Sequence, residues 1–303
     1  MEILNFLKDN PHLIAFDNIE TINNANIAIK DNHLTFNKGN EFFVFLDNFD
    51  KFNSLNFEIK KEQDINIYLI TYQSRKIEID YNFELQEKAN LKIFTIFSSR
   101  RNTLLDVNLK FNLAKDAKLT ILNALTFNGE VKFNETVNLN GLNATVDIDL
   151  LNVGGKTSKY YVNQDVFHNE KATISNIDNW LIATDQAKLA YSVSGSIKKG
   201  KEFSKCRQSN KGIMLSDNCE IMVEPKLFID EYNVEASHGA AIGQMDELQL
   251  YYLLSRGLTE NDARSLIISG YTNPFISLID NKEIAAQLTS QISRLIRRKT
   301  YNE

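Results

Sequence analysis

The stretch Asp116-Ala117-Lys118-Leu119-Thr120-Ile121 contains the pattern that decides the fold. A turn-forming residue precedes a small residue, and aliphatic residues follow at the second and fourth positions after the small one. This period of two indicates a strand with one face in a core, and an Asp or Asn before it suits a turn. Further copies start at Ala25, Ala89, Ala144, Ala187 and Cys219.

A small residue at a tight corner, followed by a strand, is what a stacked coil requires, because each coil needs the next one to cover its inner face. The copies are irregularly spaced, so two architectures remain: a parallel β-helix with coils of variable length, or an antiparallel sandwich. Few hairpin turns join neighbouring strands, with Asn128-Gly129 and Asn140-Gly141 as exceptions. Their scarcity favours the β-helix.

After residue 245 the pattern becomes helical. Residues 246–256 predict a helix that is apolar on nearly all sides, with Gly257 as its C-cap. Thr259 opens a second helix that we expect to end near Ile268, before Gly270 and Pro274. An amphipathic helix follows around residues 284–295. The chain therefore divides into a short N-terminal segment (1–24), a β-helix body (25–243) and a C-terminal helical domain (244–303).

Composition limits the possible functions. The formal net charge of −5 argues against nucleic acid as a partner, and no run of 18 apolar residues predicts a membrane span. The N-terminus has no export signal, so we expect a cytoplasmic protein. In that compartment Cys206 and Cys219 are not expected to form a disulfide. Cys219, at a corner of the repeat, is expected to be a buried structural thiol.

No arrangement of residues typical of an active site stands out, so we do not expect an enzyme. His168 is expected to satisfy a hydrogen bond inside the body. His238 differs, because Ser237, Gly239 and Ala240 leave its ring without bulky neighbours in the sequence. A neutral imidazole ligates transition metals, although an ordinary packed histidine also fits the local pattern.

The region from Gln208 onward resembles the SufB/SufD family of iron–sulfur cluster assembly proteins, and the form Ser-His-Gly-Ala at 237–240 is most similar to SufD. The other residues that carry the resemblance are Asn210, Leu215-Ser216, Pro225, Leu227, Ile229, Ile242-Gly243, Asp246, Tyr252-Leu253, Ser255-Arg256-Gly257 and Ala263-Arg264. Likeness back to about residue 110 is weaker. Against this resemblance, we expect the chain to lack most of the N-terminal helical domain usual in the family.

The resemblance implies a right-handed parallel β-helix followed by a helical domain. It also implies a non-catalytic scaffold that pairs with a SufB-like paralogue through the β-helix and with a SufC-like ABC ATPase through its C-terminal helices. His238 would serve iron acquisition or nascent cluster assembly at the shared interface, so a transient iron or cluster is expected there and none in the isolated chain. Glu235 could supply an oxygen ligand. The residues expected to face the ATPase are Leu248, Tyr252, Ser255, Arg256, Gly257 and Tyr271.

Alternatives remain open at this point. A SufB-type role or a homodimer would fit if no separate paralogue exists, and Cys206 or Cys219 could then accept sulfur. A structural partner that binds no metal is also possible. A β-helix carbohydrate-active enzyme would need clustered carboxylates in an exposed groove, and the sequence shows none.

Overall fold

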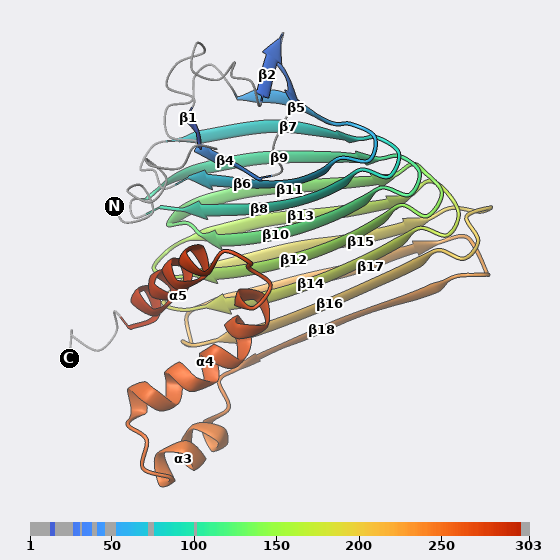
Figure 1. Ribbon diagram of the computed structural model, residues 1–303. Coiled ribbons are helices and arrows are strands. Elements are labelled where there is room, and N and C mark those ends of the chain that lie inside the picture. The colour runs from blue at the N-terminus through green and yellow to red at the C-terminus, as the bar shows by residue number, and fades with distance from the viewer. Residues whose placement is uncertain are drawn as a thin grey trace.

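The computed structural model describes residues 13–15, 27–30, 32–37, 41–45, 53–71, 76–99 and 102–297. Two nine-stranded sheets lie face to face, and three helices stand at one end of the first sheet (Figure 1). From β4 onward the chain alternates between the two sheets, and all strand pairings are parallel except that of β2 with β3. The parallel β-helix is therefore confirmed, and the antiparallel sandwich is excluded.

The first sheet contains, in spatial order, β1 (Leu13–Ala15), β4 (Glu41–Phe45), β6 (Asp64–Thr71), β8 (Asn90–Ser98), β10 (Lys118–Thr126), β12 (Thr145–Gly154), β14 (Ile174–Ala183), β16 (Lys205–Met214) and β18 (Glu235–Gln244). The second sheet contains β2 (Ile27–Lys30), β3 (His33–Phe36), β5 (Ser54–Ile59), β7 (Ile77–Leu85), β9 (Thr103–Leu113), β11 (Gly129–Leu139), β13 (Lys159–His168), β15 (Lys188–Ile197) and β17 (Glu220–Ile229).

The parallel register stacks identical side chains above one another in the core. Phe57, Phe83 and Phe111 are in register on three neighbouring strands. Their rings are stacked, with centroids 4.5 and 4.7 Å apart, and all three are buried. Each buried phenylalanine contributes about 1.5–3 kcal/mol through the apolar area removed from water. The alternation of the sequence thus becomes continuous columns in the core.

The corners explain the irregular spacing of the repeat. One corner precedes the strands of the first sheet and includes Ala89, Ala117 and Ala144, and another precedes those of the second sheet and includes Ala187 and Cys219. The pattern is therefore one motif used at two corners in turn. The copy at Ala25 begins outside the described residues.

A left-handed residue closes most of the described coils at the first corner. Asp116 has φ +57° and Asn143 has φ +59°, a conformation that Asp and Asn tolerate better than most residues. The N–H of Asp116 donates to the carbonyl of Leu142 at 2.9 Å, one coil further along. The small residue that follows is buried, because the next coil packs directly over it.

The helices in the described part of the chain are α3 (Glu247–Ser255), α4 (Glu260–Ile276) and α5 (Lys282–Arg297). The predicted first helix is confirmed, with Asp246 as its N-cap and Gly257 at φ +90° after its end. The predicted end of the second helix near Ile268 is wrong, because α4 continues to Ile276 with Pro274 in its last turn. Phe275, which is fully buried, packs that turn onto the first sheet and offsets the hydrogen bond that proline removes.

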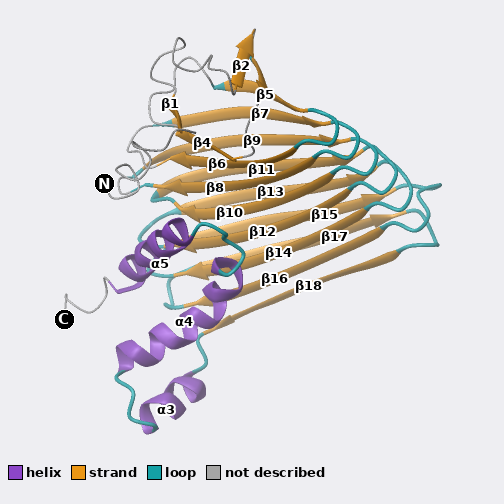
Figure 2. Cartoon of the chain, viewed as in Figure 1, coloured by secondary structure: helices purple, strands orange, loops and turns teal. Residues whose placement is uncertain are grey.

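The helices do not form one uniform layer. Helices α4 and α5 bury apolar residues against the first sheet, whereas α3 has no buried residue and extends away from the body (Figure 2). The buried residues of α4, α5 and the segment between them that form this cluster are Ile267, Ile268, Phe275, Ile279, Ile284, Leu288 and Ile292.

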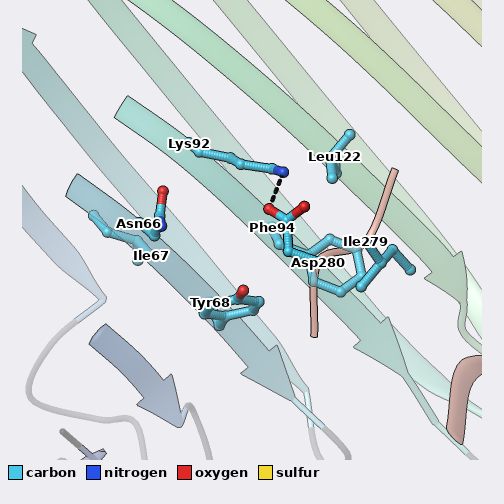
Figure 3. Close-up of a pocket in the computed structure, with 8 residues that line it drawn as sticks. All are labelled: Asn66, Ile67, Tyr68, Lys92, Phe94, Leu122, Ile279 and Asp280. Carbon is cyan, nitrogen blue, oxygen red and sulfur yellow. Dashed lines mark hydrogen bonds and ion pairs between the residues drawn. The ribbon is translucent and has the colours of Figure 1, made fainter. Parts of the chain in front are cut away.

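A polar contact holds the segment between α4 and α5. Lys92 of β8 pairs with the carboxylate of Asp280 and donates to the carbonyl of Leu278 at 3.3 Å. Figure 3 shows this pair beside the apolar side chains of Phe94 and Ile279. The helical bracket formed by α4 and α5 is thus fixed to the sheet by apolar packing with an ion pair at its edge.

Candidate metal-ligand site at the last coil

His238 lies on β18, which is the terminal strand of the first sheet. The strand pairs with β16, and the register places His238 opposite Gln208. Gln208 is buried in the core, so His238 lies on the core-facing side of the sheet. Its side chain is nevertheless exposed, because no further coil covers β18 in the described part of the chain.

The small residues around His238 leave space at this strand. A Cβ built on Gly239 or Gly243 would meet no atom within 4 Å. Almost every residue of β18 is exposed, and only Ile242 is half-buried, against the core of the preceding coil. The last coil, β17 and β18, therefore presents an open end of the β-helix with one imidazole on its core-facing side.

A buried polar column reaches this end from inside the body. The amide of Asn210 donates to the carbonyl of Gly239 at 3.1 Å, directly after His238. Asn179 Nδ2 donates both to Asn210 Oδ1 and to Gln164 Oε1, each at 2.8 Å. Gln164 in turn donates to Glu135 Oε2 at 3.1 Å. Hydrogen bonds thus connect a carboxylate in the middle of the core with the backbone of β18.

Glu135 is the only ionisable member of the column. Burial raises its pKa to about 7, while hydrogen bonds from Asn123 and Gln164 oppose the shift. Sequence reasoning missed this residue, although its position was visible in the alternation. Glu135 falls in step with the core residues Val131, Phe133 and Val137, where a polar side chain is costly unless it is hydrogen-bonded.

Glu235 does not lie beside His238. The two residues are three positions apart along β18, and this odd offset puts them on opposite faces of the sheet. Glu235 is opposite Lys205 in the register. The two side chains form an exposed ion pair of 2.8 Å. The structure therefore does not bring the two predicted ligands onto one ion within this chain.

The other sequence candidates lie inside the body. His168 is buried, and its two ring nitrogens bond Thr173 Oγ1 at 2.7 Å and Ser175 Oγ at 2.9 Å. This confirms its interpretation as a hydrogen-bonded core residue, and burial lowers its pKa to about 4.

Both cysteines are free, as expected, and the expected burial of Cys219 is confirmed; Cys206 is buried too. Cys219 occupies its corner and donates from Sγ to the carbonyl of Ser216 at 3.0 Å. Cys206 lies opposite Ala236 in the register, and burial raises the pKa of its thiol above the ordinary value. A buried, protonated thiol is a poor nucleophile, which disfavours sulfur acceptance at Cys206.

Within the described residues, no group of three or more His, Cys, Asp and Glu side chains could hold a metal ion. His238 is a single ligand, and transition metals in proteins take several. A metal at this end would need further ligands from outside the described residues. Across the same residues, no helix is both long and apolar enough to cross a membrane.

The residues expected to face an ATPase lie mostly on the exposed helix α3. Leu248 is 79% exposed and Tyr252 is 54% exposed, and the guanidinium of Arg256 lies 5.2 Å from the ring centroid of Tyr252. Ser255 and Gly257 are also exposed. Tyr271 of α4 differs, because it packs half-buried against the cluster between the bracket and the sheet.

A groove of about 350 Å³ runs between α3 and the end of β16. Its apolar lining includes Met214, Leu215, Met245, Leu250 and Leu254. An uncovered helix with exposed apolar side chains, next to a groove whose lining is both apolar and polar, is typical of a protein–protein contact.

The family model described as "SUF system FeS cluster assembly, SufBD core domain" matches residues 70–271, which is more than half of the chain. The iron–sulfur cluster assembly protein SufD of Bacillus subtilis is 30% identical over 184 residues, covering 60% of this chain and 42% of that protein. SufD of Escherichia coli is 24% identical over 182 residues, covering 60% and 43%. A SufBD family protein of Pyrococcus horikoshii is 35% identical over 104 residues, covering 34% and 22%.

The matched part of the chain thus spans less than half the length of these relatives. The β-helix occupies most of the range that the family model matches, and the last coil with His238 falls inside it. On fold, matched range and relatives together, the chain belongs to the SufBD family of the SUF iron–sulfur cluster assembly system.

Proposed function

We propose that this chain is a SufD-like, non-catalytic scaffold for iron–sulfur cluster assembly in the cytoplasm. Its last coil pairs with a SufB-like family member, His238 supplies one ligand to iron or a nascent cluster at that interface, and α3 binds a SufC-like ABC ATPase. The family match and the SufD relatives support the general role. The observation that carries the proposal is the exposure of His238 on the core-facing side of a terminal strand.

The proposed pairing surface is the edge strand β18. A terminal strand presents backbone N–H and C=O groups that another strand can pair with. Exposed apolar side chains on β17 lie in the same coil, with Met222 at 52% and Phe228 at 58% exposure. Burial of these side chains would add apolar area to a contact that backbone hydrogen bonds hold in register.

The proposed role of His238 is that of one metal ligand among several. One imidazole cannot hold iron firmly, so the partner must complete the coordination, and a shared site forms only when the two subunits meet. The ring of His238 is exposed on its own face of β18, where groups from that partner can reach it. Glu235 lies on the other face, where its carboxylate pairs with Lys205 of the same chain.

The test is co-expression of this chain with a SufB-like and a SufC-like partner, followed by anaerobic purification. His238→Ala is expected to leave the complex assembled and to lower its bound iron or cluster. Ser237→Ala is the matched control, because it changes the adjacent residue on the opposite face of the same strand. Equal iron in the two variants would contradict the ligand role.

The same open end could pair with a second copy of this chain. The isolated chain tests that alternative, because a homodimer would be seen by light scattering at micromolar concentration. A dimer that the SufB-like partner fails to displace would favour a homodimeric scaffold over the proposed heterodimer.

A further inference from the structure

Gln208 carries a polar atom without a partner. Its side chain is only 2% exposed, and its Nε2 donates to the carbonyl of Lys226 at 3.2 Å. Its Oε1, however, is buried with no hydrogen-bond partner in the described chain. A buried amide oxygen without a donor is unfavourable, so a donor is expected from a group that can reach it.

The neighbouring strands offer one such group. On β14 the residue in register with Gln208 is Ile177, and on β18 it is His238. Of the other core-facing residues of β18, Ala236, Ala240 and Ile242 have no side-chain donor. The amide of Gln244 lies six residues along the strand from His238, opposite Met214, and so too far away to reach Gln208. Paired strands lie about 4.8 Å apart, so the imidazole and the amide are adjacent in one core column.

The other polar groups near Gln208 are already engaged. Asn210 donates to the carbonyl of Gly239, and the thiol of Cys206 is hydrogen-bonded to Ser175. Gly195 leaves room for the amide, since a Cβ there would lie 3.3 Å from Gln208 Nε2. The amide nitrogen thus stays on Lys226, and the oxygen remains for His238.

We infer that Gln208 is a positioning residue for His238: its Oε1 accepts the N–H of one ring nitrogen and leaves the other nitrogen free to bind a transition-metal cation. The inference rests on the proposed ligand role of His238. Histidines that bind metals commonly donate their second N–H to an oxygen, which fixes the tautomer and the ring orientation. The hydrogen bond from Asn210 to Gly239 fixes the backbone directly after the same ring.

The first arm of the test needs no metal. The chain has four histidines, so two-dimensional ¹H–¹⁵N spectra of the ¹⁵N-histidine-labelled full chain can resolve each tautomer. At pH about 8.5, two units above the ordinary imidazole pKa, His238 is expected to show one tautomer in the wild type. Gln208→Met, which removes the acceptor, is expected to give a mixture, and Gln208→Glu, which keeps an oxygen, is expected to retain the single form.

The control variant is Asn152→Leu. Asn152 is also a buried amide with an unpartnered oxygen, and its Nδ2 donates to Tyr191 Oη at 2.7 Å, away from His238. Its loss is expected to leave the His238 tautomer unchanged. A tautomer mixture in the wild type, or the same tautomer in Gln208→Met as in the wild type, would overturn the inference.

The second arm uses the assembled complex and iron(II). Gln208→Met is expected to weaken iron binding by about 10–100-fold, the usual effect of removing a partner of a ligating histidine, and Gln208→Glu is expected to restore it. If His238→Ala binds iron like the wild type, the proposed ligand role fails, whatever the spectra show. If His238→Ala loses iron and Gln208→Met does not, the positioning role alone fails.

Discussion

Gln164 and Glu135 lie side by side on two neighbouring strands of the core, where Gln164 Nε2 donates to Glu135 Oε2 at 3.1 Å. Asn123 donates to the other carboxylate oxygen at 2.9 Å from the opposite sheet. Both carboxylate oxygens accept an amide N–H. When the carboxyl group is protonated, its O–H needs an acceptor, so one of the two amides must turn to present its oxygen. Asn123 can turn at low cost, because its neighbour Thr95 has a hydroxyl that both donates and accepts.

Glu135 therefore gives stability a pH dependence that we expect to measure. Its pKa is raised from 4.5 to about 7 by burial, so the folded state binds a proton that the unfolded state has released. The associated stability is fully present below pH 4.5 and is lost as the pH rises through 7, with a total of about 3 kcal/mol. Glu135→Gln is expected to remove this component in urea unfolding between pH 5 and 8.

The difference between wild type and Glu135→Gln isolates this group. Asp149 acts in the same direction, since burial also raises its pKa to about 7, but it is present in both proteins. A difference curve that is flat from pH 5 to 8 would contradict the assignment.

His168 predicts the opposite dependence on pH. Burial lowers its pKa from 6.5 to about 4, so the unfolded state binds the proton more readily. The stability that it contributes is present above pH 6.5 and is lost as the pH falls through 4. His168→Leu is expected to lose about 1–3 kcal/mol at pH 7, because Thr173 and Ser175 lose a partner, and to be less sensitive to acid. Unfolding of His33→Gln, at an exposed histidine, is the comparison.

The sequence predicted the corners and strands well because both depend on local chemistry. Ala117 and Cys219 follow turn-forming residues and begin alternating strands, and the structure places both at corners. The sequence could not show that they belong to two different corners, because coil length is set by stacking against neighbours. The sequence also predicted too early an end for α4, because the packing of Phe275 against the sheet is a tertiary effect that local sequence does not show.

The candidate site was only partly predictable. The small residues beside His238 indicated an open position, and the structure confirms that the ring is exposed. Which face of the sheet it occupies depends on the register with Gln208, and a period of two cannot fix that register alone. Glu235 was a candidate because it is close in sequence, yet it lies on the other face.

Two kinds of contact attach the helical bracket to the first sheet, an ion pair and apolar packing, and we expect them to contribute unequally to stability. The Lys92–Asp280 pair is partly exposed, with Asp280 at 72%, so Lys92→Met is expected to cost less than about 1 kcal/mol. Phe275 is fully buried against Phe94 and Trp180, and Phe275→Ala is expected to cost about 3–5 kcal/mol. Hydrogen exchange in α4 and α5 measures both costs. Equal protection in the two variants would contradict the larger contribution of Phe275.

Helix α3 provides a test that leaves the fold intact. Leu248 is 79% exposed and α3 buries no residue of its own, so Leu248→Glu is expected to change the free energy of unfolding by less than about 0.5 kcal/mol. If α3 binds the ATPase, the same charge placed in the apolar contact is expected to abolish co-purification of the SufC-like partner. Leu266→Glu is the matched control, because Leu266 is 54% exposed on α4. Loss of the ATPase only in the Leu266 variant would contradict binding through α3 and would place the docking surface on the bracket.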